Sequence, residues 1–251
     1  MLTIGNFQPL GLAVLFAGIF AFGNCIRLPG PLARHQRKLL SFSAGISVAY
    51  VFLHLLPEVE TARAALVRTT ADSSLPLPAY LVSLFALAGF MLFVGVDRLV
   101  AWARPTGDRA VEQDEGGGLD YRLHVGIFAI YAGLVTYLRI NALEEGETPV
   151  LLFALAMGMH FLTVDHGLSR EYGASYQRAG RFVLAGAAIA GWALGVVVEL
   201  SKPLMILPLA LLSGAIIAIS LIEELPRENE GRFWPFLAGG AFYAAILVPL
   251  A

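Results

Sequence analysis

Stretches of about 20 mostly apolar residues recur along the whole chain, and this is the length that an α-helix needs to cross the hydrocarbon core of a bilayer. Eight such stretches can be delimited, at residues 8–27, 38–56, 75–102, 121–140, 148–167, 180–200, 203–222 and 233–250. Only 14% of the 251 residues are charged, against about 25% in an ordinary soluble domain. We therefore expect an all-α integral membrane protein, a bundle of eight transmembrane helices forming one domain over residues 1–251.

The basic residues predict the orientation of this bundle, because Lys and Arg are retained on the cytoplasmic side of a membrane. The loops that follow the first, third, fifth and seventh stretches hold 13 of the 17 Lys and Arg residues. The other four are Arg63, Arg68, Arg139 and Lys202. This distribution predicts a multi-pass protein of the inner or plasma membrane with both termini outside. No Lys or Arg precedes Arg27, so we expect the first stretch to stay in place rather than to be cleaved as a signal peptide.

Composition and motifs disfavour several classes of function. The net charge is −2 and the basic residues lie in short loops, so nucleic acid is not an expected partner. Cys25 is the only cysteine, so any metal site must be built from His and carboxylates. The longest connection, residues 103–120, is Gly-rich and acidic and is expected to be a flexible cytoplasmic loop. No nucleophile, phosphate-loop or dinucleotide motif occurs, so we expect no enzyme, with an intramembrane zinc hydrolase as the open alternative.

Residues 151–172, LLFALAMGMHFLTVDHGLSREY, place three ionisable side chains inside or at the edge of an apolar stretch: His160, Asp165 and His166. Such groups cost several kcal/mol each in hydrocarbon unless they are paired, hydrated or bound to metal. The cluster therefore predicts a functional site. The alternative is that His160 only hydrogen-bonds across a helix interface, while Asp165 and His166 already lie among lipid headgroups.

An internal repeat is indicated by residues 44–58, AGISVAYVFLHLLPE, and 213–227, SGAIIAISLIEELPR, which align without a gap. The alignment places Gly45 on Gly214, Ala49 on Ala218, Leu56 on Leu225, Pro57 on Pro226 and His54 on Glu223. The second and seventh helices would cross the membrane in opposite directions. This predicts inverted repeats, helices 1–3 and helices 6–8, around central helices 4 and 5, an architecture that many transporters use to build a midplane site. Small apolar residues are so common here that a chance match is the alternative.

Three features carry a resemblance to a known family: GISVAYVFLHLLPE at residues 45–58, ELPRE at 224–228, and eight stretches with both termini outside. Together they resemble the ZIP (Zrt/Irt-like) metal-ion transporters. That family has His-Asn-x-x-Asp-Gly in its fourth helix, where residues 124–129 here read HVGIFA and keep only His124. It has His-Glu-x-x-His in its fifth helix, where residues 160–164 read HFLTV and keep only His160.

The resemblance implies transport of a divalent cation toward the cytoplasm without nucleotide. It makes His124 and His160 facing metal ligands, with Asp165 as a displaced substitute and His166 as a further candidate. Imidazole and carboxylate suit Zn²⁺ or a similar first-row ion. Asp165 lies about 140° around the helix from His160, so the two can reach one ion only if the helix is distorted.

Two further pairs are candidates for admitting and releasing the ion. His54 and Glu58, near the outer end of the second helix, would receive it, and Glu223 and Glu224, near the inner end of the seventh, would pass it on. Pro57 is expected to end or kink the second helix and to leave Glu58 at the outer interface. The alternatives are a Glu that merely extends into the headgroups and a surface ion pair, which contributes little.

The first hypothesis is thus a ZIP-like zinc transporter, with membrane lipid and a divalent metal ion as partners and homodimer formation left open. The alternative is a non-transporting ZIP-like membrane protein with a binding, sensing or structural role. Three or more of the candidate side chains within metal-bonding reach would favour transport. A dry, apolar space between the fourth and fifth helices would favour the alternative.

Overall fold

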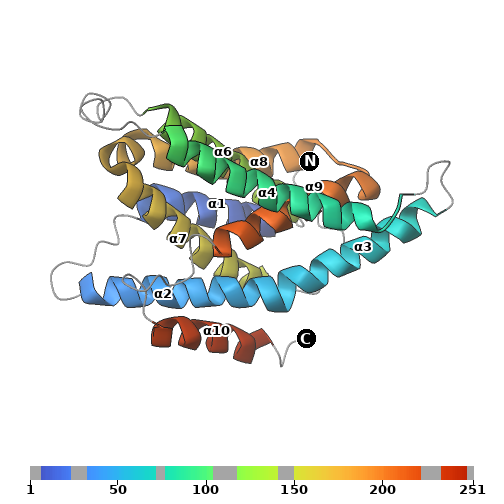
Figure 1. Cartoon of the computed structure of the whole chain (residues 1–251), viewed down its shortest axis with the longest axis horizontal. Helices are drawn as coiled ribbons and strands as arrows, with labels where there is room; N and C mark the ends of the chain where they lie inside the picture. Colours follow the sequence, from blue (N-terminus) through green and yellow to red (C-terminus); the bar gives the residue numbers. More distant parts are fainter. Residues whose placement is uncertain are drawn as a thin grey trace.

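The computed structural model describes residues 7–23, 33–71, 77–103, 118–140, 150–221 and 233–247. The elements of these residues are all helical, which confirms the predicted all-α class for this part of the chain. In order they are α1 (Phe7–Phe22), α2 (Ala33–Tyr50), the π-helical turn η4 (Val51–Leu55), α3 (Leu56–Thr70), α4 (Tyr80–Ala103), α6 (Leu119–Ile140), α7 (Val150–Ser175), the π-helical turn η6 (Tyr176–Gly180), α8 (Arg181–Val197), α9 (Lys202–Ile219) and α10 (Phe233–Leu247) (Figure 1).

The described helices have the length and composition of membrane-spanning segments. Four runs are long and apolar enough to cross a bilayer, namely Lys38–Thr70, Tyr80–Trp102, Leu119–Arg139 and Val150–Val197. Large apolar side chains also remain on the surface of the bundle, with Trp102 83% and Leu151 81% exposed. Exposed apolar side chains on such helices are expected where a protein faces lipid. These are the features of a membrane-embedded helical protein.

The predicted count of eight separate helices is not reproduced, because the described residues form seven continuous helical runs. Most residues of the predicted fifth and sixth stretches belong to one run, Val150–Val197. This run changes direction at Gly173, which has φ 47° and ψ −119°. Figure 1 shows the chain turning between α7 and α8. Only glycine adopts such a conformation without a steric penalty. Because Gly173 alone makes the turn, helical hydrogen bonding resumes directly after it.

Of the two outcomes expected at Pro57, an end or a kink of the second helix, the end is wrong. Helical structure runs from Ala33 through Pro57 to Thr70, with the widened turn η4 just before the proline. The N–H of Leu56 bonds to the carbonyl of Val51, five residues back. A proline lacks an N–H and its ring clashes with the carbonyl of the preceding turn, and a π-helical turn makes room for the ring. The helix therefore continues beyond Pro57, and Glu58 lies in the first turn of α3.

Glycines let α2 pack closely against α10. A Cβ atom added to Gly45 of α2 would overlap the carbonyl oxygen of Phe236 in α10. One added to Gly239 of α10 would overlap the carbonyl oxygen of Phe42 in α2. Such contacts between backbones are the usual means of helix association in a membrane, where no hydrophobic effect drives helices together.

The pair α4 and α9 repeats this contact. A Cβ atom on Gly214 of α9 would overlap the carbonyl oxygen of Ala86 in α4. One on Gly89 of α4 would overlap the carbonyl oxygen of Leu211 in α9. Each pair is thus joined through one close glycine on each of its two helices.

The centre of the bundle is occupied by α7, which packs against α1 and α2 (Figure 1). Phe161 of α7 is fully buried, and its ring centroid lies 5.0 Å from those of both Phe16 and Phe20 in α1. Phe161 stands where the ZIP pattern has a glutamate, and its packing explains why the position is apolar here. With Phe161 directed at α1, the preceding residue, His160, faces α2 and α6.

Candidate functional site

His160 is the most deeply buried of the candidate histidines, with 1% of its surface exposed. Its Nδ1 lies 3.1 Å from Oγ of Ser47 in α2, and its Nε2 lies 2.8 Å from the hydroxyl of Tyr131 in α6. A neutral imidazole has one donor and one acceptor nitrogen, and a hydroxyl can serve either role. Both ring nitrogens are therefore hydrogen-bonded, and three helices meet at this one side chain.

The contact between α2 and α7 follows from two serines one helical turn apart. Ser43 and Ser47 are four residues apart and so lie on the same face of α2. The hydroxyl of Ser43 donates to the carbonyl of Leu39 at 3.0 Å and lies 3.4 Å from the sulfur of Met159. Ser47 contacts the next residue of α7, His160. This polar face of α2 fixes the imidazole in its position.

Asp165 belongs to a second polar group, nearer the end of α7. Its Oδ1 accepts a hydrogen bond of 2.6 Å from the hydroxyl of Tyr176, and Asp165 as a whole is 1% exposed. The turn at Gly173 brings Tyr176 back against α7. A second hydrogen bond, 2.7 Å from the side-chain amide of Gln177 to the hydroxyl of Ser169, holds the two segments together. Short hydrogen bonds to a carboxylate are among the stronger kind. The buried carboxylate is thus compensated by a phenol.

The backbone just after α1 also approaches Asp165. A Cβ atom added to Gly23 would lie 2.7 Å from Oδ2 of Asp165. The absence of a side chain at Gly23 therefore provides the space that the carboxylate occupies.

His124 forms a third group at the start of α6. Its Nδ1 lies 2.9 Å from the hydroxyl of Tyr172 and 3.6 Å from Oε1 of Glu171. The hydroxyl of Tyr121 donates to the carbonyl of Ser175 at 3.0 Å. These contacts join the start of α6 to the end of α7 and leave His124 4% exposed.

The predicted outer pair lies at the other end of the bundle. His54 and Glu58 are half-buried, and the ring of His54 lies 5.3 Å from that of Tyr50. Tyr50 also lies 6.4 Å from the ring of Phe153, over which the guanidinium of Arg139 stands at 5.0 Å. This end therefore carries an aromatic cluster with basic and acidic groups around it.

The structure does not bring the predicted metal ligands into one group. Between His124 and His160 the rings of Phe128 and Tyr131 form a chain, with successive centroid distances of 5.2, 6.3 and 5.8 Å. His166 lies half-buried on α7, while Glu223 and Glu224 lie outside the described residues, as does most of the 103–120 loop. Among the residues that the structure describes, no three His, Cys, Asp or Glu side chains are placed to hold a metal ion.

The hydroxyl partners of the three buried ionisable groups were not predicted from the sequence; they are Ser47, Tyr131, Tyr172 and Tyr176. A signal was present, because each is a polar-tipped residue in or beside an apolar stretch. Buried Tyr hydroxyls usually have hydrogen-bond partners. The partner of each could not be chosen without knowing which helices are neighbours.

The chain matches no protein-family model, no curated protein and no solved structure. The likeness to ZIP transporters therefore rests on features of this sequence alone.

Proposed function

We propose that the protein is a ZIP-like membrane transporter that moves a divalent cation, Zn²⁺, toward the cytoplasm without nucleotide. The position of His160 carries this proposal. An imidazole that is 1% exposed and held between α2, α6 and α7 is costly in an apolar bundle, and intramembrane ionisable groups mark ion pathways. Imidazole nitrogen is also a preferred ligand of Zn²⁺.

Further polar groups on both sides of His160 support a path along α7. Toward the start of α7 lie His54 and Arg139, grouped around Tyr50 and Phe153. Toward its end lie the Asp165 and His124 groups. An ion moving along α7 would meet imidazole or carboxylate at three levels.

Binding at His160 would require a local rearrangement. A metal ion takes a lone pair of a ring nitrogen, and both nitrogens now face hydroxyls. Coordination would therefore displace Ser47 or Tyr131 and bring in other ligands, with Asp165 and His124 as the candidates from the chain. In this proposal cation binding is coupled to movement of α7 against α2 or α6, as alternating access requires.

The proposal includes inverted repeats, and the glycine contacts support them. The alignment of residues 44–58 with 213–227 pairs α2 with α9. In each of these four helices, the residue whose carbonyl oxygen makes the contact lies three residues before the close glycine. The pairs are Phe42 and Gly45 in α2, Leu211 and Gly214 in α9, Phe236 and Gly239 in α10, and Ala86 and Gly89 in α4. The same set of backbone contacts thus joins α2 to α10 and α9 to α4. With the turn at Gly173 placing α7 and α8 on separate crossings, the chain would cross the membrane eight times with both termini outside.

A second candidate is a non-transporting ZIP-like protein with a binding, sensing or structural role. It is favoured by the lack of a three-ligand group among the described residues. In that case the hydroxyls around His160 would serve only to fix the packing of three helices.

Calorimetric titration of the purified protein with Zn²⁺ at pH 7.5 separates the two candidates. The transporter should bind Zn²⁺ in the micromolar range, and acidification should weaken binding because a protonated imidazole is not a ligand. A folded variant with both His124→Ala and His160→Ala should lose binding. Glu60→Gln, which changes an exposed residue paired with Arg63, is the control and should retain it. No binding by the unmodified protein would favour the second candidate.

A further inference from the structure

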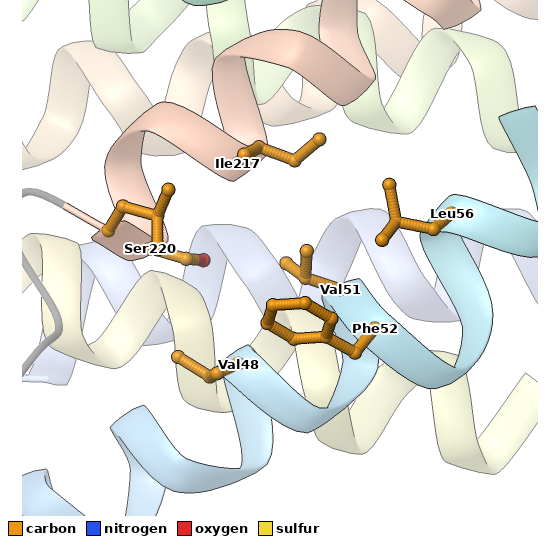
Figure 2. Close-up of a pocket in the computed structure, with 7 residues that line it drawn as sticks. Val48, Val51, Phe52, Leu56, Ile217 and Ser220 are labelled. Carbon is orange, nitrogen blue, oxygen red and sulfur yellow. The ribbon is translucent and has the colours of Figure 1, made fainter.

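Two parts of the surface differ in what they can recognise in a lipid. One is a pocket between α9 and the junction of α2 with η4 (Figure 2), and its accessible lining is apolar. Such a lining can hold hydrocarbon but does not distinguish one lipid from another. The other is the turn from α7 through η6 into α8, where Arg178 and Arg181 lie beside exposed apolar side chains. This turn offers the charge that recognition of a headgroup requires.

The guanidinium of Arg181 is fixed by packing. It stands over the ring of Phe182, 4.5 Å from the ring centroid. Its Nε is buried without a hydrogen-bond partner, whereas its two terminal nitrogens are not enclosed. No hydrogen bond or ion pair joins these nitrogens to any residue that the structure describes. A guanidinium held in this way directs its terminal edge outward, and that edge can form two parallel hydrogen bonds with a phosphate.

Arg178 adds a second positive charge to the turn. It is exposed and lies four residues before Phe182 in one helical run, so the two side chains share a face. The Nε of Arg178 lies 3.4 Å from the carbonyl oxygen of Ala174, which leaves its terminal nitrogens for other partners. No Asp or Glu occurs between Glu171 and Glu199. The segment that follows α7 is therefore purely basic.

The buried carboxylate of Asp165 offsets only part of this charge. It lies within electrostatic range of Arg181, but its Oδ1 is bonded to Tyr176 and the residue is 1% exposed. The neighbouring Arg170 and Glu171 carry opposite charges and leave the balance unchanged. One buried negative charge against the two arginines of the turn gives a net positive charge at the surface.

We propose that this turn binds the headgroup of an anionic phospholipid. The phosphate would accept hydrogen bonds from the terminal nitrogens of Arg178 and Arg181. The acyl chains would lie along α8, where Phe182 and Val183 are 52% and 49% exposed. Charge directly beside exposed apolar surface favours a lipid over a free phosphate, which would leave the apolar part uncovered. In the orientation proposed above, this lipid belongs to the cytoplasmic leaflet, where anionic lipids give the surface its negative potential.

The test is native mass spectrometry of the full chain in detergent, titrated with phosphatidylglycerol or with phosphatidylcholine of the same acyl chains. The parent protein should bind the first phosphatidylglycerol about tenfold more tightly, because the choline cation of the other lipid is repelled by the arginines. Arg181→Gln should weaken binding of phosphatidylglycerol about tenfold, as expected for a lost hydrogen bond between charged groups. Arg181→Lys should recover only part of the affinity, because it restores the charge without the planar fork.

The matched control is Arg98→Gln, which removes an exposed arginine near the end of α4, on the same side of the bundle (Figure 1). It should change the affinity less than twofold. An equal loss in Arg98→Gln and Arg181→Gln would reveal unspecific attraction and overturn the proposal. Arg178→Gln changes an exposed residue and should also weaken binding several-fold, so the test stands even if Arg181→Gln fails to fold.

A competition experiment separates a lipid from a free phosphate. Glycerol 3-phosphate, the headgroup chemistry without acyl chains, should not displace phosphatidylglycerol at equal concentration. Displacement would assign the arginines to a free phosphate and overturn the proposal, as would equal affinity of the parent protein for the two lipids. None of these results depends on whether the protein transports zinc.

Discussion

Replacing Gly45 by Ala tests the close packing of α2 against α10. The added Cβ would overlap the carbonyl oxygen of Phe236 and would lie 2.9 Å from the amide nitrogen of Gly240. Both obstacles are backbone atoms, which cannot turn aside as a side chain would, so the two helices must move apart. Overpacking of this kind costs about 1–3 kcal/mol, and the better helix propensity of Ala offsets up to about 1 kcal/mol. We expect a net loss of about 1–2 kcal/mol in the free energy of unfolding.

A set of variants turns this into a test of the repeat. Gly214→Ala meets the matching contact in the other helix pair and should cost a similar amount. Combined with Gly45→Ala, its effect should be additive, because the two contacts are separate. Gly239→Ala combined with Gly45→Ala should be less than additive, because both act on one interface. The assay is equilibrium unfolding in mixed detergent micelles, followed by circular dichroism or by Trp fluorescence.

The control for this series is Gly186→Ala in α8, where no described atom lies within 4 Å of the added Cβ. It should be neutral or should stabilise the protein by up to about 1 kcal/mol. If Gly45→Ala is as harmless as Gly186→Ala, the backbone contact between α2 and α10 is wrong. If Gly45→Ala is costly and Gly214→Ala is not, the equivalence of the two helix pairs fails.

Three further outcomes are expected. Tyr131→Phe leaves one nitrogen of a buried imidazole without its partner and should lower the free energy of unfolding by about 1–3 kcal/mol, so an unchanged thermal midpoint would contradict the hydrogen bond. Gly173→Ala forces an L-residue into a conformation that such residues rarely adopt and should lower the free energy of unfolding by about 1–3 kcal/mol in the same assay. Gly167→Ala is the control and should cost little, so equal effects of the two changes would refute the turn assigned at Gly173. In a cysteine-free background, a cysteine at Gly117 should be protected from an impermeant thiol reagent in intact cells and one at Ser73 should react, and the reverse pattern would invert the orientation.

The helices could be predicted because the number of consecutive apolar residues is a direct measure of what a bilayer requires. Two local features could not. Pro57 normally ends a helix, and its continuation depends on the widened turn before it. Gly173 lies in a polar segment that resembles an ordinary loop, yet a single residue there turns a continuous helical run. Both depend on backbone conformation that hydropathy does not encode.

The site was predictable only as a list of ionisable residues. The place of His160 in an apolar stretch favoured its burial, whereas for Asp165 a place among lipid headgroups was left open, and the structure buries both residues. Their partners, Ser47 and Tyr176, come from other elements and could not be chosen before the helix neighbours were known. Phe161 shows the limit of motif matching. It stands where the ZIP motif has a glutamate, yet its ring packs against α1 and so contributes to the packing of the helices.

Zinc uptake into proteoliposomes tests the central claim most directly. Purified protein would be reconstituted around a fluorescent zinc indicator, and Zn²⁺ would be added outside without nucleotide. If the protein is a zinc transporter, the parent protein and Glu60→Gln should show saturable uptake, and a folded His160→Ala variant should show uptake at the level of protein-free liposomes. Uptake by the parent protein no faster than that of protein-free liposomes, or uptake unchanged by His160→Ala, would contradict this claim.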